Sequence, residues 1–156
     1  MDAVSRIEAA LNSALQRADG PSCPLKLMAA MQHSVFPRGA RVRPRLCLAV
    51  AAACGDDNPA ISDTAAASIE LLHCASLVHD DLPCFDDADT RRGLPTVHRT
   101  FGEPLAVLAG DALIVLAFEN LVRLSFTPQR MTALLTIIAR AVGAPNGIVA
   151  GQAWES

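Results

Sequence analysis

The sequence predicts an all-α protein built as one domain, residues 1–156. The chain is 51% hydrophobic but only 4% aromatic, and a composition dominated by alanine and leucine favours helix over sheet. Glycines and prolines divide it into segments of ordinary helix length. No internal repeat, low-complexity tract or linker separates these segments. We therefore expect a single helical domain with enough apolar material for a core.

Three helices are expected in the first third of the chain. The first covers residues 2–17 and ends at the glycine and prolines of ADGPSCP. The second lies near residues 25–34 and is broken by FPRGAR. In RPRLCLAVAAAC the helical pattern resumes, with Pro44 in its first turn and Gly55 at its end.

Further helices are expected after the turn sequence GDDNPAISD. Asp63 is placed to cap a helix that runs from Thr64 to about His79. RGLPTVHRTFGEP is interpreted as a loop, and helices over about residues 105–124 and 128–142 follow it. GAPNG then precedes a last helical turn in IVAGQAWES.

Composition excludes several classes of function. The 13 Lys+Arg against 16 Asp+Glu give a net charge of -3, and without a basic run no nucleic-acid partner is expected. Five scattered cysteines lack the spacing of a zinc site and indicate reduced thiols in a cytoplasmic protein. The N-terminal MDAVSRIEAALNSALQ has no signal-peptide pattern. The apolar stretch PLAVLAGDALIVLAF contains Asp111 and is too short to cross a bilayer, so no membrane span is expected.

The stretch LLHCASLVHDDLPCFDDADTRRG, residues 71–93, concentrates the polar chemistry. It places five aspartates, two arginines and two histidines directly after an apolar helical run. Steps of three and four residues put His73, Ser76 and Asp80 on one helix face, about 10 Å from first to last. Pro83 then disfavours helical geometry, so the helix should kink or end before the following aspartates.

Paired carboxylates follow this helix. The spacing leaves open whether Asp86 or Asp87 faces Asp80, but either pair offers the hard oxygen ligands that magnesium combines with water and substrate phosphate. Arg91 and Arg92 come next, and the planar guanidinium matches phosphate oxygens. Acid, metal and arginine together indicate a site for a diphosphate.

The alternative interpretation is a solvated turn. Charge runs after a helix are usually surface features, and a lone histidine such as His73 is usually a core residue. The order of the residues favours a site: a histidine, then paired aspartates, then Arg-Arg-Gly, with GARVRP supplying more arginines after the flexible Gly39.

HDDLPCFDDADTRRGLPTVH resembles the first aspartate-rich motif of the trans-isoprenyl diphosphate synthases, in its DDxxxxD form. GARVRP resembles their GKRLRP element, and FGEPLAVLAGDAL and GIVAGQAWE extend the resemblance from about residue 35 to the end of the chain. The sequence most resembles the bacterial geranylgeranyl diphosphate synthases of carotenoid biosynthesis. This resemblance implies an antiparallel helical bundle of the isoprenoid synthase type. It also implies a prenyltransferase that uses Mg2+ to condense isopentenyl diphosphate with a dimethylallyl, geranyl or farnesyl diphosphate.

The resemblance implies roles for individual residues in metal and allylic substrate binding. Asp80 and Asp86 correspond to magnesium ligands, with Asp81 alongside them. Arg91 corresponds to a contact with the allylic diphosphate. Because these groups stabilise the ionising substrate, Asp80, Asp86 and Arg91 are the implied catalytic residues.

A second set of residues corresponds to the binding of isopentenyl diphosphate. Its diphosphate would be held by Arg43, His73 and Arg92. Gln152 corresponds to a residue near the reacting allylic carbon.

Product length in the family depends on residues just before the aspartate motif. Ala75 and Ser76 lie about 6–8 Å from Asp80 along the helix, where family members that stop at farnesyl length often carry a bulky aromatic side chain. Both residues are small here, so the prenyl chain is expected to pass this level and reach geranylgeranyl length.

Three features depart from the family pattern. Ala40 replaces the lysine of GKRLRP, so one phosphate contact is missing unless Arg38 or Arg41 substitutes. Glu155 in GQAWE replaces the aspartate of the family's GQxxD element. Family members also carry a second DDxxD motif in a C-terminal half, and this chain resembles the N-terminal half only.

Two hypotheses therefore stay open. The first is a prenyltransferase, of which this chain is a fragment, a truncated frame or a short natural form. The second is a non-catalytic helical protein that keeps the binding half and acts as a partner subunit of a complete synthase. In either case we expect an incomplete bundle with exposed apolar faces, which favours a homodimer or pairing with a complete synthase.

Overall fold

The structure is a computed structural model that describes residues 2–36, 39–124 and 127–155, and within them regular structure is almost entirely helical, which confirms the predicted all-α class. The helices are α1 Ala3–Ala18, α2 Leu25–Val35, α3 Val42–Ala53, α4 Pro59–Asp80, α5 Val97–Phe101, α6 Glu103–Val122, α7 Pro128–Val142 and α8 Ile148–Glu155. A two-stranded hairpin, β1 Thr90–Arg91 and β2 Leu94–Pro95, precedes α5.

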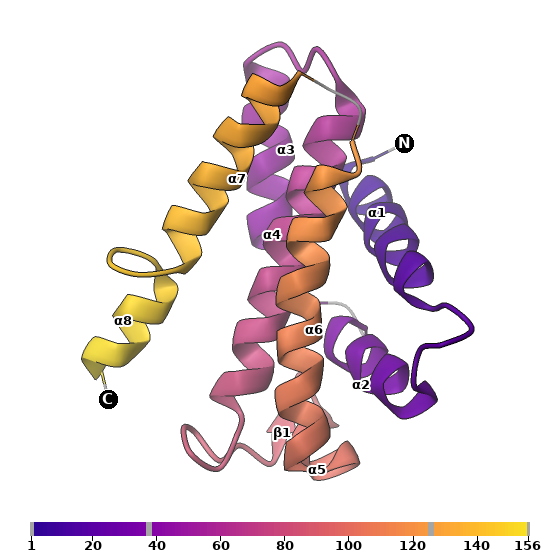
Figure 1. Cartoon of the computed structure of the whole chain (residues 1–156), viewed down its shortest axis with the longest axis vertical. Helices are drawn as coiled ribbons and strands as arrows, with labels where there is room; N and C mark the ends of the chain where they lie inside the picture. Colours follow the sequence, from indigo (N-terminus) through magenta and orange to yellow (C-terminus); the bar gives the residue numbers. More distant parts are fainter. Residues whose placement is uncertain (1, 37–38, 125–126, 156) are drawn as a thin grey trace.

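Helix α4 forms the centre of an antiparallel bundle (Figure 1). It runs antiparallel to α6 and also packs against α1, α2 and α3. The core is built from side chains that are completely enclosed, among them Ile7, Leu11, Leu71, Leu113 and Leu121. Burial of apolar surface at about 25 cal/mol per Å² therefore fixes α4 along its length, including the end that carries the predicted site.

The start of α4 differs from the prediction. The helix begins at Pro59, a residue suited to the first turn because an N–H there has no intrahelical partner. Asp63, predicted to be the cap, lies inside the helix, and its carboxylate accepts a hydrogen bond of 2.7 Å from Nε of Arg6 on α1. The capping prediction is wrong because a contact with another helix, invisible to local spacing, determines the role of this side chain.

Residues 92–104, predicted to be a loop, contain the turn and second strand of the hairpin, α5 and the first residues of α6. The two strands pair antiparallel with Arg91 opposite Leu94. Arg92 and Gly93 form the turn with φ of 53° and 80°, the positive values that a tight two-residue hairpin turn requires. The hairpin consequently holds two adjacent arginines in defined positions beside the end of α4.

Helix α6 is longer than its apolar stretch suggested. Its 20 residues, Glu103–Val122, are long and apolar enough by length and composition to cross a membrane, so the prediction that this segment is too short is wrong. The helix packs against α2, α4 and α5, and its Ala106, Ala109 and Ala117 are completely buried. This packing is typical of the core helix of a globular protein.

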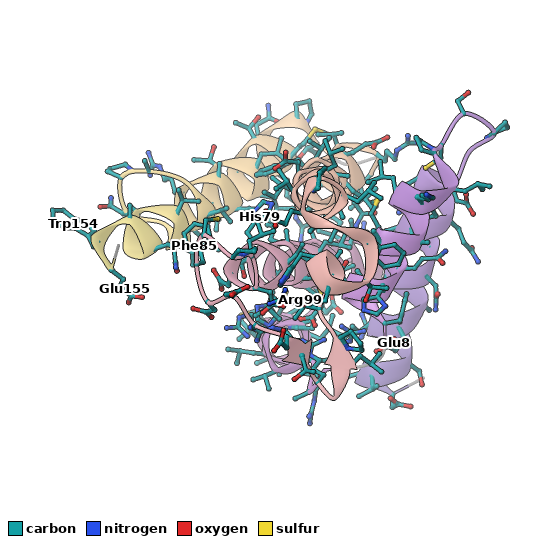
Figure 2. The ribbon with its side chains drawn as sticks, turned by 90° about the horizontal axis from the view of Figure 1, so that it is seen from below. Glu8, His79, Phe85, Arg99, Trp154 and Glu155 are labelled. Carbon is teal, nitrogen blue, oxygen red and sulfur yellow. The ribbon has the colours of Figure 1, made fainter. Side chains whose placement is uncertain are left out.

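Helices α7 and α8 lie along one side of the bundle, with α8 standing apart from α4 (Figure 1). Near the start of α7, Arg130 donates to both carboxylate oxygens of Asp57 at 2.7 and 2.9 Å. Among the described residues of α8 none is buried. Trp154 is 90% exposed and points away from the bundle (Figure 2). The prediction of exposed apolar side chains is also met on α6, where Leu108 and Val115 are exposed.

Candidate functional site

The loop after α4 brings the aspartate motif back to the end of that helix. The N–H of Asp86 donates to the carbonyl of Asp80 at 2.9 Å. Asp87 turns to the other side of the loop, where its carboxylate accepts from Nη2 of Arg99 at 3.0 Å. The question that spacing left open is therefore decided by the fold of the loop, which pairs Asp80 with Asp86.

The paired carboxylates form an electrostatically unfavourable arrangement. Burial raises the pKa of Asp80, and the neighbouring charge of Asp86 is the next cause; Asp81 adds to the effect, while Arg91 and His79 oppose it. A divalent cation relieves such repulsion, and two carboxylates are the protein share of many magnesium sites. Within the described ranges no three His, Cys, Asp or Glu side chains have metal-binding geometry.

Asp81 lies beside this pair but serves Arg91. Both of its oxygens accept from Nε of Arg91, at 2.8 and 2.9 Å, and one also accepts from Nη2 at 2.5 Å. The Asp81 side chain is 4% exposed, whereas that of Arg91 is 34% exposed. This geometry argues against the metal role expected for Asp81 and indicates instead that Asp81 orients Arg91.

A cationic group lies next to the same end of α4. Nη1 of Arg43 is 3.3 Å from Nε2 of His73. Burial lowers the pKa of His73, and the charges of Arg43, Arg92 and Arg91 lower it further. The guanidinium of Arg92 lies over Gly39, where an added Cβ would be 2.5 Å from its Cζ atom. The structure thus gathers Arg43, His73 and Arg92, the three residues expected to hold one diphosphate.

Arg41 does not belong to this group. Its guanidinium is buried, with Nε donating to Glu8 at 2.9 Å, Nη1 to Glu70 at 2.8 Å and Nη2 to a backbone carbonyl of α2 at 2.9 Å. Since these bonds enclose the charge, the prediction that Arg41 could replace the missing lysine is wrong. Arg38, the other candidate, lies outside the described residues.

A groove of about 730 Å³ opens between α4 and α8. Its lining residues come from these helices and the aspartate loop: Ser76, His79, Asp80, Phe85, Ile148, Val149, Gly151, Gln152, Ala153 and Glu155. Figure 2 shows Phe85 on the side of the bundle toward α8. Asp80 therefore lies in a mainly apolar groove that also contains Gln152, a composition typical of small-molecule sites.

The two residues expected to control product length have different environments. Ser76 lines the groove. Ala75 is completely buried in the core and does not line it. Among the two, only Ser76 is placed to contact a chain in the groove of this structure, and the role expected for Ala75 stays a prediction.

A smaller cavity lies between α2, α4 and the hairpin. Its volume is about 40 Å³, and Asp81, Arg91 and Arg92 are among its lining residues. A space of this size accommodates a water molecule but not a diphosphate ester. A pocket of about 560 Å³ between α1 and α2 is larger but contains none of the predicted site residues, whereas the groove beside Asp80 combines sufficient size with several of them.

Several residues around the site were not identified from the sequence. Glu8 and Glu70 bind Arg41, while Thr96 and His98 contact the aspartate loop. The available signal for the two glutamates was their place on otherwise apolar helix faces, since a buried carboxylate needs a partner. No local pattern distinguished Thr96 or His98, because the loop that they contact is brought to them by the tertiary fold.

Comparison with known proteins gives a consistent result. Residues 24–156 match the polyprenyl synthetase family. A geranylgeranyl diphosphate synthase of Cereibacter sphaeroides is 59% identical over 152 residues, 97% of this chain and 53% of that protein. One of Rhodobacter capsulatus is 55% identical over 153 residues, again 97% and 53% of the two chains. The crystal structure of a geranyltransferase from Legionella pneumophila has a TM-score of 0.90 and 35% identity, covering 98% of this chain and 53% of that one. The chain thus spans about half the length of the curated relatives it matches.

Proposed function

The chain belongs to the polyprenyl synthetase family, and from that premise we propose that it supplies the diphosphate-binding wall of a prenyltransferase. The proposed reaction joins isopentenyl diphosphate to an allylic diphosphate and leads to geranylgeranyl diphosphate, the product named for the two bacterial relatives. One observation carries the proposal: the paired carboxylates of Asp80 and Asp86 lie beside a group of arginines, and Asp80 lines an apolar groove of substrate size.

Asp80 and Asp86 would hold magnesium together with oxygens of the allylic diphosphate. A bound magnesium ion stabilises the negative charge that develops on the diphosphate when the allylic C–O bond breaks. Arg91 adds a second positive group at the same place. Of the five N–H bonds of its guanidinium, Asp81 uses one on Nε and one on Nη2, which leaves three for phosphate oxygens.

Arg43, Arg92 and His73 would hold the diphosphate of isopentenyl diphosphate. The lowered pKa of His73 favours its neutral ring, which can donate one hydrogen bond without adding to the repulsion between the arginines. The arginines supply the charge, and their planar donors match phosphate geometry. The proposal thus assigns Arg91 to the allylic diphosphate and Arg92, the next residue, to the diphosphate of isopentenyl diphosphate.

The groove must also protect a carbocation from water. After ionisation, the double bond of isopentenyl diphosphate attacks the allylic cation, and a proton then passes to the released diphosphate. The apolar side chains of Phe85, Ile148 and Val149 line the groove and would supply part of the apolar cover that shields such a cation from water. Gln152 and Ser76 line the same groove, Gln152 near the reacting carbon and Ser76 along the growing chain.

Calorimetry tests the binding part of this proposal. Farnesyl diphosphate titrated into the chain with Mg2+ should bind, and binding should weaken at least about tenfold in Asp80→Asn, because one of two carboxylate ligands is lost. Asp19→Asn, which removes an equal charge at the exposed end of α1, should leave the affinity unchanged. Equal affinities for the wild-type chain and Asp80→Asn would remove the basis of the magnesium assignment.

Turnover distinguishes the two hypotheses for the chain. With Mg2+, farnesyl diphosphate and isopentenyl diphosphate, a catalytic chain forms geranylgeranyl diphosphate, which chromatography detects. A chain that binds both substrates without turnover is either a fragment of such an enzyme or a binding subunit of a complete synthase. Addition of such a synthase and measurement of its product lengths would then test the pairing.

A further inference from the structure

The loop that carries Asp86 is held from two sides. On its inner side, the carbonyl groups at the end of α4 accept from loop amides: Asp80 from Asp86 at 2.9 Å, and Asp81 from Ala88 at 3.2 Å. Asp87, between the two donors, has φ of 46°, a left-handed conformation that is uncommon outside glycine. A loop with such a residue keeps its shape only where the surrounding structure determines it.

The outer side of the loop is held by residues that the mechanism above does not use. The N–H of Thr96 donates to the carbonyl of Asp89 at 3.0 Å. The Thr96 hydroxyl donates to the carbonyl of Ala88 at 2.8 Å. Thr96 is 2% exposed, so the donor side of both bonds is shielded from water, which makes them stronger than bonds between fully exposed groups.

The Thr96 hydroxyl is directed to the loop in place of its usual role. Thr96 is the N-cap residue of α5, where a threonine side chain ordinarily accepts from an amide of the first helical turn. Here it makes no such capping bond. The Thr96 side chain therefore stabilises the neighbouring loop and not the start of α5.

His98 completes the arrangement. The single hydroxyl hydrogen of Thr96 is used on the Ala88 carbonyl, so the 3.1 Å contact between Thr96 Oγ1 and His98 Nδ1 requires Nδ1–H to donate. This fixes the ring, whose Nε2 atom lies 3.8 Å from a carboxylate oxygen of Asp87. Nε2 is buried and has no hydrogen-bond partner among the described residues. The ring is therefore aimed at the residue directly after Asp86.

Arg99 adds a third contact to the same segment. Its Nη2 is 3.0 Å from Asp87 and its Nε 2.8 Å from Asp89. We call Thr96, His98 and Arg99 the outer clamp. Because Arg99 is 44% exposed, its ion pairs are weaker than the buried bonds of Thr96, and Thr96 is the member on which the arrangement depends most.

We propose that the outer clamp is a set of positioning residues that holds Asp86 beside Asp80 before any ligand binds. The consequence for metal binding rests on the proposed function, whereas the consequence for the loop does not. Preorganised ligands bind metal more tightly because no loop ordering accompanies binding. Thr96 thus acts on the metal site through Ala88, and His98 acts by orienting the Thr96 hydroxyl. Arg99 acts through Asp87 and Asp89, and none of the three is proposed to contact substrate.

Amide hydrogen exchange, measured by NMR on the ligand-free chain, tests whether the outer clamp holds the loop. Thr96→Val keeps the shape of the side chain and removes its hydroxyl, so the Asp86 and Ala88 amides should exchange about tenfold faster, as expected when a buried hydrogen bond is lost. Thr96→Ser restores the hydroxyl and should stay within about threefold of the wild type. Ser68→Ala removes a buried hydroxyl that bonds Asn120, far along α4 from the loop, and should leave both loop amides unchanged.

The same variants are then titrated with Mg2+ in the presence of inorganic diphosphate. Thr96→Val should weaken magnesium binding about tenfold or more, the usual effect of removing a residue that orients a ligand, and Thr96→Ser should not. If Thr96→Val exchanges within twofold of the wild type, or if Ser68→Ala accelerates the loop amides equally, the clamp is refuted. A wild-type chain that binds no magnesium with diphosphate would refute the proposed function instead, and the exchange rates would still decide the clamp.

Discussion

Replacing Arg41 with methionine should destabilise the fold more than any substitution at the surface. Arg41 joins α1 to α4 by donating to Glu8 and Glu70 from one guanidinium. Its side chain is 1% exposed, and those of Glu70 and Glu8 are 2% and 10% exposed. Methionine fills similar space but leaves the carboxylate of Glu70 enclosed without this cation and removes one partner of Glu8.

The magnitude follows from the state in which the glutamates are left. Removing one partner from a buried ion pair costs about 3–5 kcal/mol, because the remaining charge stays uncompensated. The two pairs share one cation, so their contributions do not add, and the slight exposure of Glu8 lowers its share. With a total stability of about 5–15 kcal/mol and a urea m-value of about 2 kcal/mol per M, Arg41→Met should lower the urea midpoint by about 2 M.

Urea unfolding, monitored by circular dichroism, measures this loss of stability. Arg45→Met, at an exposed position in the first turn of α3, the helix that Arg41 precedes, is the matched control and should change stability by less than about 0.5 kcal/mol. Adding Glu70→Gln to Arg41→Met should recover part of the loss, since it removes one uncompensated charge. A loss below about 1 kcal/mol for Arg41→Met, or no recovery in the double variant, would refute the reasoning from buried charge.

Three further predictions follow from single contacts. In Gly110→Ala the new Cβ would lie 2.1 Å from Nε2 of His79, so thermal unfolding should show a loss of stability of about 1–3 kcal/mol, although alanine is the better helix former. Gly151→Ala, where nothing lies within 4 Å of the new Cβ, should lose no stability, and equal losses in the two variants would contradict the packing argument. Because the pKa of His73 is lowered from 6.5, the contribution of His73 to stability is present above pH 6.5 and is lost as the pH falls through the lowered pKa. Inorganic diphosphate counters the charge of the neighbouring arginines and should therefore bind with proton uptake in this pH range, and binding heats that do not depend on the buffer would contradict this. Ser76→Phe should weaken binding of farnesyl diphosphate more than that of dimethylallyl diphosphate, since the ring fills the groove that Ser76 lines; equal losses for both ligands would remove Ser76 from the path of the chain.

The all-α class and most helices could be predicted because helix formation is local. Apolar residues that recur every three to four positions, with glycine and proline at the ends, indicate a helix. The hydrogen bonds and side-chain contacts of a helix lie within one or two turns, so this pattern can be recognised in the sequence. The helix over residues 128–142 was predicted with its observed bounds. The proposed diphosphate site also follows from the sequence, since carboxylates and arginines gather within residues 71–93.

The tertiary structure decided which side chains remain available for that chemistry. Arg41 and Asp81 belong to the motifs by sequence, yet one is enclosed by glutamates from two other helices and the other is bonded to Arg91. Asp86 was selected over Asp87 by the fold of a loop whose outer side is held by Thr96. These outcomes depend on partners that are distant in sequence or lie across a turn, and no periodicity encodes such contacts. Local spacing therefore determined where the charges occur along the chain, whereas burial and ion pairing in three dimensions determined which of them face the groove.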